Sequence, residues 1–216
     1  MSNIPLAVVV RGGWDGHRPV EATDRYVARL RQRGYEVETF ETLDVYLDEP
    51  LLSRADLVVQ CWTMGRITAE QTDGLRAAVR GGTGFAGWHG GIVDAFRDTT
   101  GYQAVTGGQF VHHPHDFVTY EVRPLAARRE HPIVAGIGPF TVHTEQYWVH
   151  TAPDIDVLAV TDVVQDADEP FVVPVVWTRR WGAGRVFVTT VGHELKDLEV
   201  PAHDEIIMRG LTWATR

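Results

Sequence analysis

The chain has 216 residues, of which 44% are hydrophobic, enough to build the core of one ordinary α/β domain. Its formal net charge is −9, and no basic run could follow a phosphate backbone, so we expect no nucleic-acid partner. The single cysteine, Cys61, excludes both a disulfide within the chain and a cysteine-rich zinc site.

The N-terminal apolar stretch Ile4–Val10 is too short for the core of a signal peptide and has no basic leader. No stretch approaches the roughly 18 apolar residues that a membrane span needs. We therefore expect a cytoplasmic protein with no membrane partner. No linker, repeat or low-complexity segment interrupts the sequence, so we expect a single domain over residues 1–216. The sequence does not decide the oligomeric state, and a homo-oligomer stays open.

Strands and helices alternate in the first half of the chain. The continuous apolar run Ile4–Val10 is typical of a strand buried on both faces. Apolar residues at near-helical spacing predict a helix over Val20–Arg33, which Gly34 ends. Further elements are expected in this order: a strand at 35–40, a short helix at 43–53, a strand at 55–60, a helix at 68–80 and a strand at 83–87.

The second half is richer in strands. We expect strands at 117–122, 157–164, 172–178 and 184–191, a turn with a short helix in "REHPIVAGIG", and a closing helix at 200–215. The alternation in the first half predicts right-handed βαβ units and a mostly parallel sheet. The later strands are joined by few helical residues, so we expect them to form an antiparallel extension.

In open α/β sheets the ligand crevice lies beyond the carboxyl ends of the strands. Four predicted strands end in "GGWDGH", "CWTMGR", "WHGG" and "GHE", which together carry three histidines and three tryptophans. We expect these segments to line one pocket. Since such a crevice is small, His89 and His193 should lie within about 10 Å of each other.

The stretch "GFAGWHGG" has the pattern of a nucleophile elbow, a sharp strand-to-helix turn that exposes one residue between glycines. Here that residue is His89, which could act as an acid, a base or a metal ligand. The alternative is a histidine that only bonds the loop backbone. The pattern predicts an exposed side chain, whose replacement would change stability little. His193 and Glu194 form a second candidate acid/base pair, although Glu194 could instead cap a helix.

Two further segments contain candidate ligands. "FVHHPHD" places His113 and His115 on one extended face, where they could bind a divalent metal such as zinc, or simply form a polar strand end. "HTEQYWVH" carries Glu145 as a candidate catalytic carboxylate, and Tyr147 as an aromatic that could stack on a sugar or pack in the core.

Taken together, "VVVRGGWDGHRP", "GGTGFAGWHGG", "GGQFVHHP", "HPIVAGI", "HTEQYW" and "WGAGRVFVTTVGHE" resemble the ThuA-like family, named for trehalose utilisation. The resemblance spans nearly the whole chain. It implies a flavodoxin-like three-layer sandwich, similar to class I glutamine amidotransferases. Those enzymes carry a nucleophilic cysteine at the elbow, where this chain has His89, so we expect no glutamine amidotransferase activity. The family also implies a role in carbohydrate metabolism, often with disaccharides oxidised to 3-keto forms.

The sequence therefore favours an enzyme that acts on a sugar or 3-keto-sugar derivative, a disaccharide such as trehalose, by histidine acid/base chemistry. The candidate catalytic residues are His89, His193, Glu145 and Glu194. The candidate sugar-binding residues are Trp14, Asp15, His17, Trp62, Trp88, His113 and Tyr147. Two alternatives stay open: a non-catalytic sugar-binding or sensing protein, and a metal-dependent hydrolase that uses the histidine-rich segment.

Overall fold

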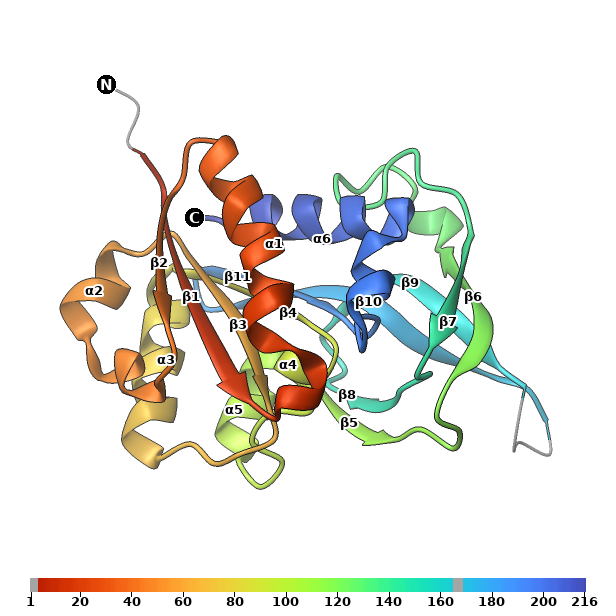
Figure 1. The fold of residues 1–216 in the computed structure, drawn as a ribbon, viewed down its shortest axis with the longest axis horizontal. Helices are drawn as coiled ribbons and strands as arrows, with labels where there is room; N and C mark the ends of the chain where they lie inside the picture. Colours follow the sequence, from red (N-terminus) through yellow and green to blue (C-terminus); the bar gives the residue numbers. More distant parts are fainter. Residues whose placement is uncertain (1–3, 165–168) are drawn as a thin grey trace.

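The computed structural model describes residues 4–164 and 169–216. Its centre is a nine-stranded sheet in the order β2-β1-β3-β4-β11-β10-β9-β6-β7 (Figure 1). Five neighbouring strands run parallel: β2 (Glu36–Phe40), β1 (Leu6–Gly13), β3 (Leu57–Thr63), β4 (Gly84–Trp88) and β11 (Gly184–Thr189). The carboxyl ends of these strands therefore meet at one edge of the sheet.

The remaining strands extend the sheet in antiparallel fashion: β10 (Phe171–Trp181), β9 (Asp156–Val163), β6 (Val118–Pro124) and β7 (Phe140–Thr144). A separate antiparallel pair consists of β5 (Gly108–His112) and β8 (Trp148–Thr151). This confirms the expected parallel sheet with an antiparallel extension. The placement of the strand at 184–191 in that extension was wrong. A tight turn brings β11 back antiparallel to β10, and β11 thereby takes the direction of β4 and joins the parallel part.

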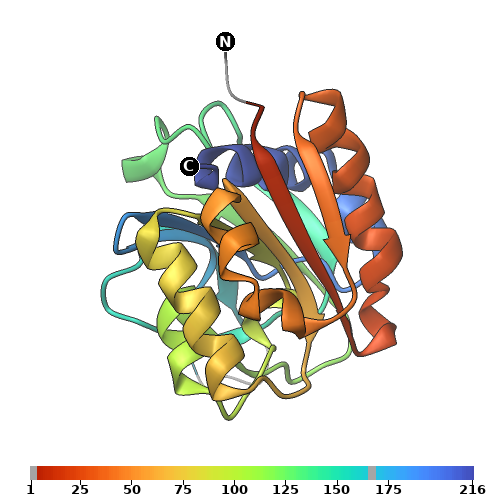
Figure 2. The ribbon, with the colours of Figure 1, turned by 90° about the vertical axis from the view of Figure 1, so that its left-hand side faces the viewer.

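Helices cover both faces of the sheet and complete the three layers of a flavodoxin-like fold. Figure 2 shows α1 (Pro19–Gln32) on one side of the sheet, and α2 (Glu49–Arg54), α3 (Ala69–Gly81) and α5 (Thr100–Thr106) on the other. The apolar residues of the closing helix α6 (Pro201–Ala214) belong to the same hydrophobic cluster as those of α1. Two hydrophobic clusters result, one on each face of the sheet. The shorter helices are η1 (Asp15–His17), η2 (Leu43–Leu47), α4 (Gly90–Val93), η3 (Ala126–Arg128) and η4 (Leu195–Glu199).

The long helices and most of the predicted strands are confirmed, including the five-residue strands β2 and β4, while several other short elements differ. Helix α3 starts where the sequence placed it, because Thr68 and Gln71 form a reciprocal capping box. The expected helix at 43–53 is instead a 3₁₀ turn, η2, followed by α2, since Asp48 caps a new start. "REHPIVAGIG" forms turns without a helix. Strands β5, β7 and β8 and helices α4 and α5 were missed, because four to seven residues carry too little periodicity.

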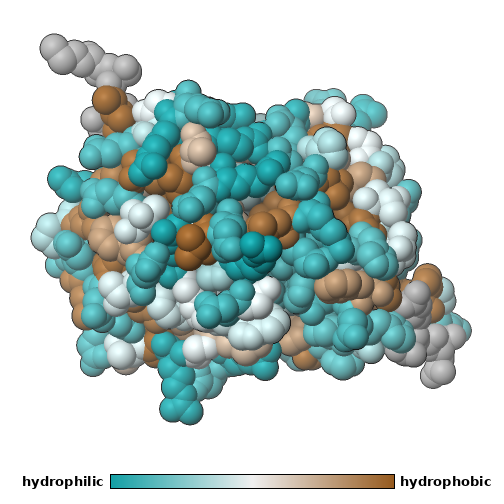
Figure 3. Space-filling view, in the orientation of Figure 1, coloured by the Kyte–Doolittle hydropathy of each residue, from teal (hydrophilic) through white to brown (hydrophobic). Residues whose placement is uncertain are grey.

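The surface in Figure 3 is largely hydrophilic, with apolar residues scattered among polar ones on the face shown. Scattered apolar residues are normal on soluble surfaces and do not define a docking patch. Among residues 4–164 and 169–216, no helix combines the length and apolarity that crossing a membrane requires.

Candidate functional site

Three histidines and one glutamate converge at the carboxyl edge of the parallel strands. His17 follows β1, His89 follows β4, His193 follows β11, and Glu145 follows β7. The ring centroids of His89 and His193 are 5.5 Å apart, which confirms the predicted proximity. The His17 ring lies 4.6 Å from His89 and 4.8 Å from His193. We call these four residues the histidine–glutamate cluster.

His89 occupies a strained turn. Its φ of 48° and ψ of −145° fall in a region that residues other than glycine rarely adopt, as expected for an elbow between β4 and α4. Its side chain, however, is only 1% exposed, so the prediction of an exposed side chain was wrong. Nδ1 lies 2.7 Å from the carbonyl oxygen of Thr190, and Nε2 lies 3.1 Å from Oε2 of Glu145. The ring stacks on Tyr147 at 4.1 Å, and the turn therefore aims His89 inward, at Glu145.

The glycines around this turn serve close packing. A Cβ atom on Gly90 would lie 2.4 Å from Cε1 of His17, and one on Gly91 would lie 2.8 Å from Cα of Cys61. Gly90 therefore lets the His17 ring pack against the turn, while Gly91 lets the turn approach β3. Only Gly90 gives room to the histidine–glutamate cluster itself.

His17 links the end of β1 to the rest of the cluster. Its Nδ1 lies 2.8 Å from Oγ1 of Thr63, at the end of β3. Its Nε2 lies 3.1 Å from Nδ1 of His193. Burial, together with the nearby His89 and His193, lowers the pKa of His17 to about 2. The imidazole is therefore neutral at physiological pH.

Glu145 is the centre of the cluster. Its Oε2 is 3.1 Å from Nε2 of His89 and 3.0 Å from Nδ1 of His193. Burial by itself opposes ionisation, but the neighbouring His193 and His89 outweigh it and hold the Glu145 pKa well below its usual range. Burial and the Glu145 charge also raise the pKa of Tyr147, which stays protonated. An ionised carboxylate thus sits among imidazoles.

A more open rim surrounds the buried cluster. The side chain of His113 is 30% exposed, and its Nε2 lies 3.5 Å from Oε1 of Glu145. Trp14 is 46% exposed and contacts the His17 ring edge-on. The Phe117 ring lies 5.1 Å from that of His193, which is itself 15% exposed. A ligand would meet His193, His113 and these aromatic rings before the buried members.

Two candidates from the sequence lie elsewhere. Trp88 is 1% exposed and packs at 4.8 Å on Tyr26 in the core under α1, because successive side chains of β4 point to opposite faces of the sheet. It therefore cannot contact a sugar at this edge. Glu194 caps η4 by accepting from the backbone N–H of Asp197, and it pairs with Lys196. The carboxylate that orients His193 is Glu145.

The remaining candidates occupy less central positions. Asp15 is exposed in η1, and Trp62 is half-buried with its ring against Gly12. The Nδ1 atom of His113 lies 2.8 Å from the backbone carbonyl oxygen of His115. The contact between these two residues is therefore from a ring nitrogen to a backbone oxygen, and not between two imidazole rings. Within the described part of the chain, the residues that converge with metal-ligand geometry are the four of the cluster. His113 and His115 are not among them.

Sequence reasoning missed three supporting residues. Thr63 and Thr190 hold the outer nitrogens of His17 and His89, and Phe117 covers His193. Thr63 follows a buried strand within "CWTMGR", so its place at a strand end was a usable signal. Thr190 acts through its backbone, which leaves no side-chain signal. Phe117 begins the strand expected at 117–122, but that strand pattern does not indicate a contact with His193.

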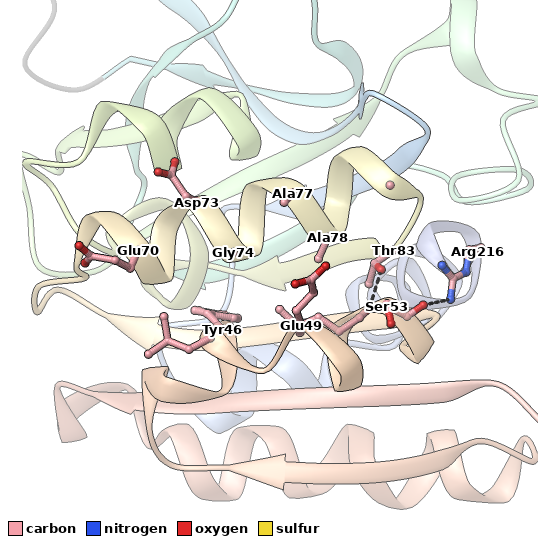
Figure 4. Close-up of a pocket in the computed structure, with 13 residues that line it drawn as sticks. Tyr46, Glu49, Ser53, Glu70, Asp73, Gly74, Ala77, Ala78, Thr83 and Arg216 are labelled. Carbon is pink, nitrogen blue, oxygen red and sulfur yellow. Dashed lines mark hydrogen bonds between the residues drawn. The ribbon is translucent and has the colours of Figure 1, made fainter.

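A cavity of about 530 Å³ lies away from the cluster, between η2 and α2 on one side and α3 on the other (Figure 4). Tyr46, Glu49, Glu70, Asp73 and Arg216 are among the residues that line it. None of its lining residues comes from the strand ends that carry the histidines. The cluster, with its perturbed pKa values and convergent polar atoms, is the better candidate for a functional site.

Fold and site together define an α/β sandwich protein with a buried polar centre at the carboxyl edge of its sheet. The family model for ThuA, described as trehalose utilisation, matches residues 6–214. The chain belongs to the ThuA family, which gives it a carbohydrate-related role.

Solved structures share this fold. A ThuA-like protein from Bacteroides uniformis matches with a TM-score of 0.80 and 14% identity, over 99% of this chain and 93% of that one. A ThuA-like protein from Parabacteroides merdae matches with a TM-score of 0.78 and 16% identity, over 98% and 90%. A β-galactosidase from Bacillus circulans matches with a TM-score of 0.64 and 12% identity, over 98% of this chain but 30% of that one. No curated protein matches the sequence significantly.

Proposed function

We propose that this protein is an enzyme that removes a proton from the carbon next to the carbonyl of a 3-keto sugar, a 3-keto disaccharide being the favoured substrate. The observation that carries the proposal is the position of His113 beside the ionised Glu145 at the open rim of the cluster. Membership of a trehalose-utilisation family supports the substrate class.

His113 has the features of a general base. Its Nδ1 faces a backbone carbonyl at 2.8 Å, so Nδ1 carries the proton and Nε2 is the basic atom. Nε2 lies 3.5 Å from Oε1 of Glu145, close enough for the carboxylate to stabilise an imidazolium as it forms. The side chain is partly exposed, so a substrate can reach it. This role replaces the direct proton transfer that the sequence assigned to His89, whose ring is buried.

The proton balance of the step is simple. Nε2 of His113 takes the proton from C2 of the 3-keto sugar, and the C–H electron pair forms an enolate. Reprotonation at C2 returns the ketone with its C2 hydrogen exchanged. In the elimination, the enolate electrons form a C1=C2 double bond and break the bond from C1 to the glycosidic oxygen, which takes a proton and leaves as an alcohol. The partly exposed rings of Trp14 and Phe117 would pack on the sugar.

The test uses 3-ketotrehalose and unoxidised trehalose in D₂O, followed by NMR. We expect deuterium at C2 of the keto sugar, or release of glucose, well above the rate in buffer, and no reaction of trehalose. His113→Ala should lower the rate roughly 10²- to 10⁴-fold, the usual contribution of a positioned base. Glu145→Gln should also lower it, because a neutral amide cannot stabilise the imidazolium.

His150→Ala is the matched control, since His150 is exposed on β8 outside the cluster and its replacement should leave the rate unchanged. Saturable binding of 3-ketotrehalose without exchange or cleavage would replace the proposal with the sugar-binding alternative. A reaction that persists in His113→Ala would exclude His113 as the base.

A further inference from the structure

The contacts within the histidine–glutamate cluster cannot all be hydrogen bonds at the same time. Nδ1 of His193 lies 3.1 Å from Nε2 of His17 and 3.0 Å from Oε2 of Glu145. With a proton, Nδ1 can donate to Glu145 but cannot accept from His17. Without a proton, Nδ1 can accept from His17, but its lone pair then faces the carboxylate oxygen of Glu145. One of the two short contacts is therefore left without a proton to share.

His89 adds to this conflict. Its Nδ1 faces the backbone carbonyl of Thr190 at 2.7 Å, which can only accept, so Nδ1 must carry a proton. A neutral His89 then presents a lone pair from Nε2 to Oε2 of Glu145, 3.1 Å away. Only a His89 with protons on both ring nitrogens could donate to Thr190 and to Glu145 at once.

A cation between these atoms resolves both conflicts. Each of the four residues offers one ligand atom with a lone pair, and these atoms all lie within 4.8 Å of one another. Around a tetrahedral ion with bonds of about 2.05 Å, neighbouring ligand atoms are about 3.3 Å apart. The three contacts of 3.0 and 3.1 Å between these atoms are close to that spacing. The widest separation among the four ligand atoms, up to 4.8 Å, would have to close as the ion binds.

The surroundings match those of metal-binding histidines. The ring nitrogen that points away from a metal usually donates to a carbonyl, hydroxyl or carboxylate, which fixes the ring and its tautomer. Nδ1 of His89 faces the Thr190 carbonyl, and Nδ1 of His17 faces the Thr63 hydroxyl at 2.8 Å. Both outer contacts come from the ends of neighbouring strands, so the sheet itself holds the inner nitrogens in place.

We propose that Nε2 of His17, Nε2 of His89, Nδ1 of His193 and a carboxylate oxygen of Glu145 bind one divalent transition-metal ion. Three imidazoles with one carboxylate favour ions such as Zn²⁺ over Mg²⁺ or Ca²⁺, which select oxygen ligands. His193 and Glu145 lie toward the rim, so this side of the ion faces the approach to the site. A bound cation there would polarise a carbonyl or hydroxyl oxygen of the ligand.

The experiment measures metal binding without any sugar. Protein purified without an affinity tag is stripped with chelator and titrated calorimetrically with Zn²⁺, Co²⁺ and Mg²⁺, and visible absorption reports the coordination of Co²⁺. We expect one equivalent of Zn²⁺ or Co²⁺, a Co²⁺ spectrum with nitrogen ligation, a higher melting temperature with the ion, and no comparable effect of Mg²⁺.

Variants identify the site. Glu145→Gln and His193→Ala should weaken Zn²⁺ binding by roughly 100-fold or more, since even the residues behind metal ligands contribute 10- to 100-fold. His150→Ala should bind as the unchanged protein does. Circular dichroism of each apo variant checks that it folds. His193 is the more exposed ligand, so His193→Ala tests the proposal if another variant does not fold.

The proposal is overturned if the unchanged protein takes up no Zn²⁺ or Co²⁺, or if Glu145→Gln and His193→Ala bind the ion as well as His150→Ala does. It stands or falls separately from the enolisation proposal. A protein that exchanges the C2 proton after chelation keeps that function without the metal, and a protein that binds Zn²⁺ but leaves 3-ketotrehalose unchanged keeps the metal site alone.

Discussion

Replacing His89 by alanine and by glycine separates the energy of its side-chain contacts from the strain of its backbone. Either replacement leaves the buried carbonyl of Thr190 without its partner at 2.7 Å, which costs about 1–3 kcal/mol. Loss of the stacking on Tyr147 adds about 0.5–1.5 kcal/mol. His89→Ala should therefore lower the free energy of unfolding by about 1.5–4.5 kcal/mol, the sum of these two costs.

His89→Gly should be less destabilising than His89→Ala. The φ of 48° with ψ of −145° costs a residue with a Cβ atom about 1–3 kcal/mol, and glycine avoids most of this cost. In an ordinary helix or strand, glycine is instead worse than alanine by about 0.5–1 kcal/mol. The order of the two variants at this position is thus the reverse of the usual one.

Urea denaturation of the apo proteins, with chelator present, measures both effects. The expected result is midpoints in the order wild type, His89→Gly, His89→Ala, with unchanged m-values. If His89→Ala unfolds within about 0.5 kcal/mol of wild type, His89 is not the buried, bonded residue described above. If glycine is no better than alanine, the turn is not strained.

Three further predictions concern neighbouring groups. Gly90→Ala should weaken Zn²⁺ binding at least about 10-fold, because its Cβ would lie 2.4 Å from the His17 ring and would displace that ligand. The control Gly81→Ala has open space around its Cβ and should bind Zn²⁺ as the unchanged protein does. Equal Zn²⁺ affinities of the two variants by calorimetry would contradict this prediction. Burial lowers the pKa of His203 from 6.5 to about 4, against the opposing effects of Asp197 and Asp204 and with a small contribution from His89. The folded state therefore binds fewer protons than the unfolded state between these pH values, and stability should fall by up to about 3 kcal/mol as the pH drops from 6.5 to 4. In His203→Gln this part of the pH dependence should disappear from urea titrations, and an unchanged profile would refute the assignment. The protein should release no ammonia from glutamine, because burial raises the pKa of the Cys61 thiol to about 12 and the thiolate is the nucleophile of that reaction. Ammonia release that disappears in Cys61→Ser would contradict this prediction.

The sequence predicted the parallel half of the fold from local patterns. Apolar runs such as Ile4–Val10 indicated strands buried on both faces, and the helices between them favour right-handed crossovers. Once β1, β3 and β4 are parallel neighbours, their ends must meet at one edge. The proximity of His17, His89 and His193 follows from that topology, because each comes within a few residues of a strand end.

The contribution of each side chain depended on tertiary contacts that leave no mark on the local sequence. The pattern around His89 predicts a sharp turn, but the direction of its ring is set by Thr190 and Glu145, which lie 101 and 56 residues away. Glu194, beside His193 in the chain, is turned away to cap η4. Glu145 enters instead from the end of β7, a strand that the sequence pattern did not reveal.

The sequence by itself therefore determined most of the buried strands, the parallel character of the first half of the sheet and the edge at which the histidines gather, because periodicity and chain connectivity act over neighbouring residues. Only the tertiary structure decided which carboxylate meets them, which ring stays buried and which reaches solvent. Those choices depend on hydrogen bonds and desolvation between segments far apart in the chain, and such interactions exist only after the sheet has closed around them.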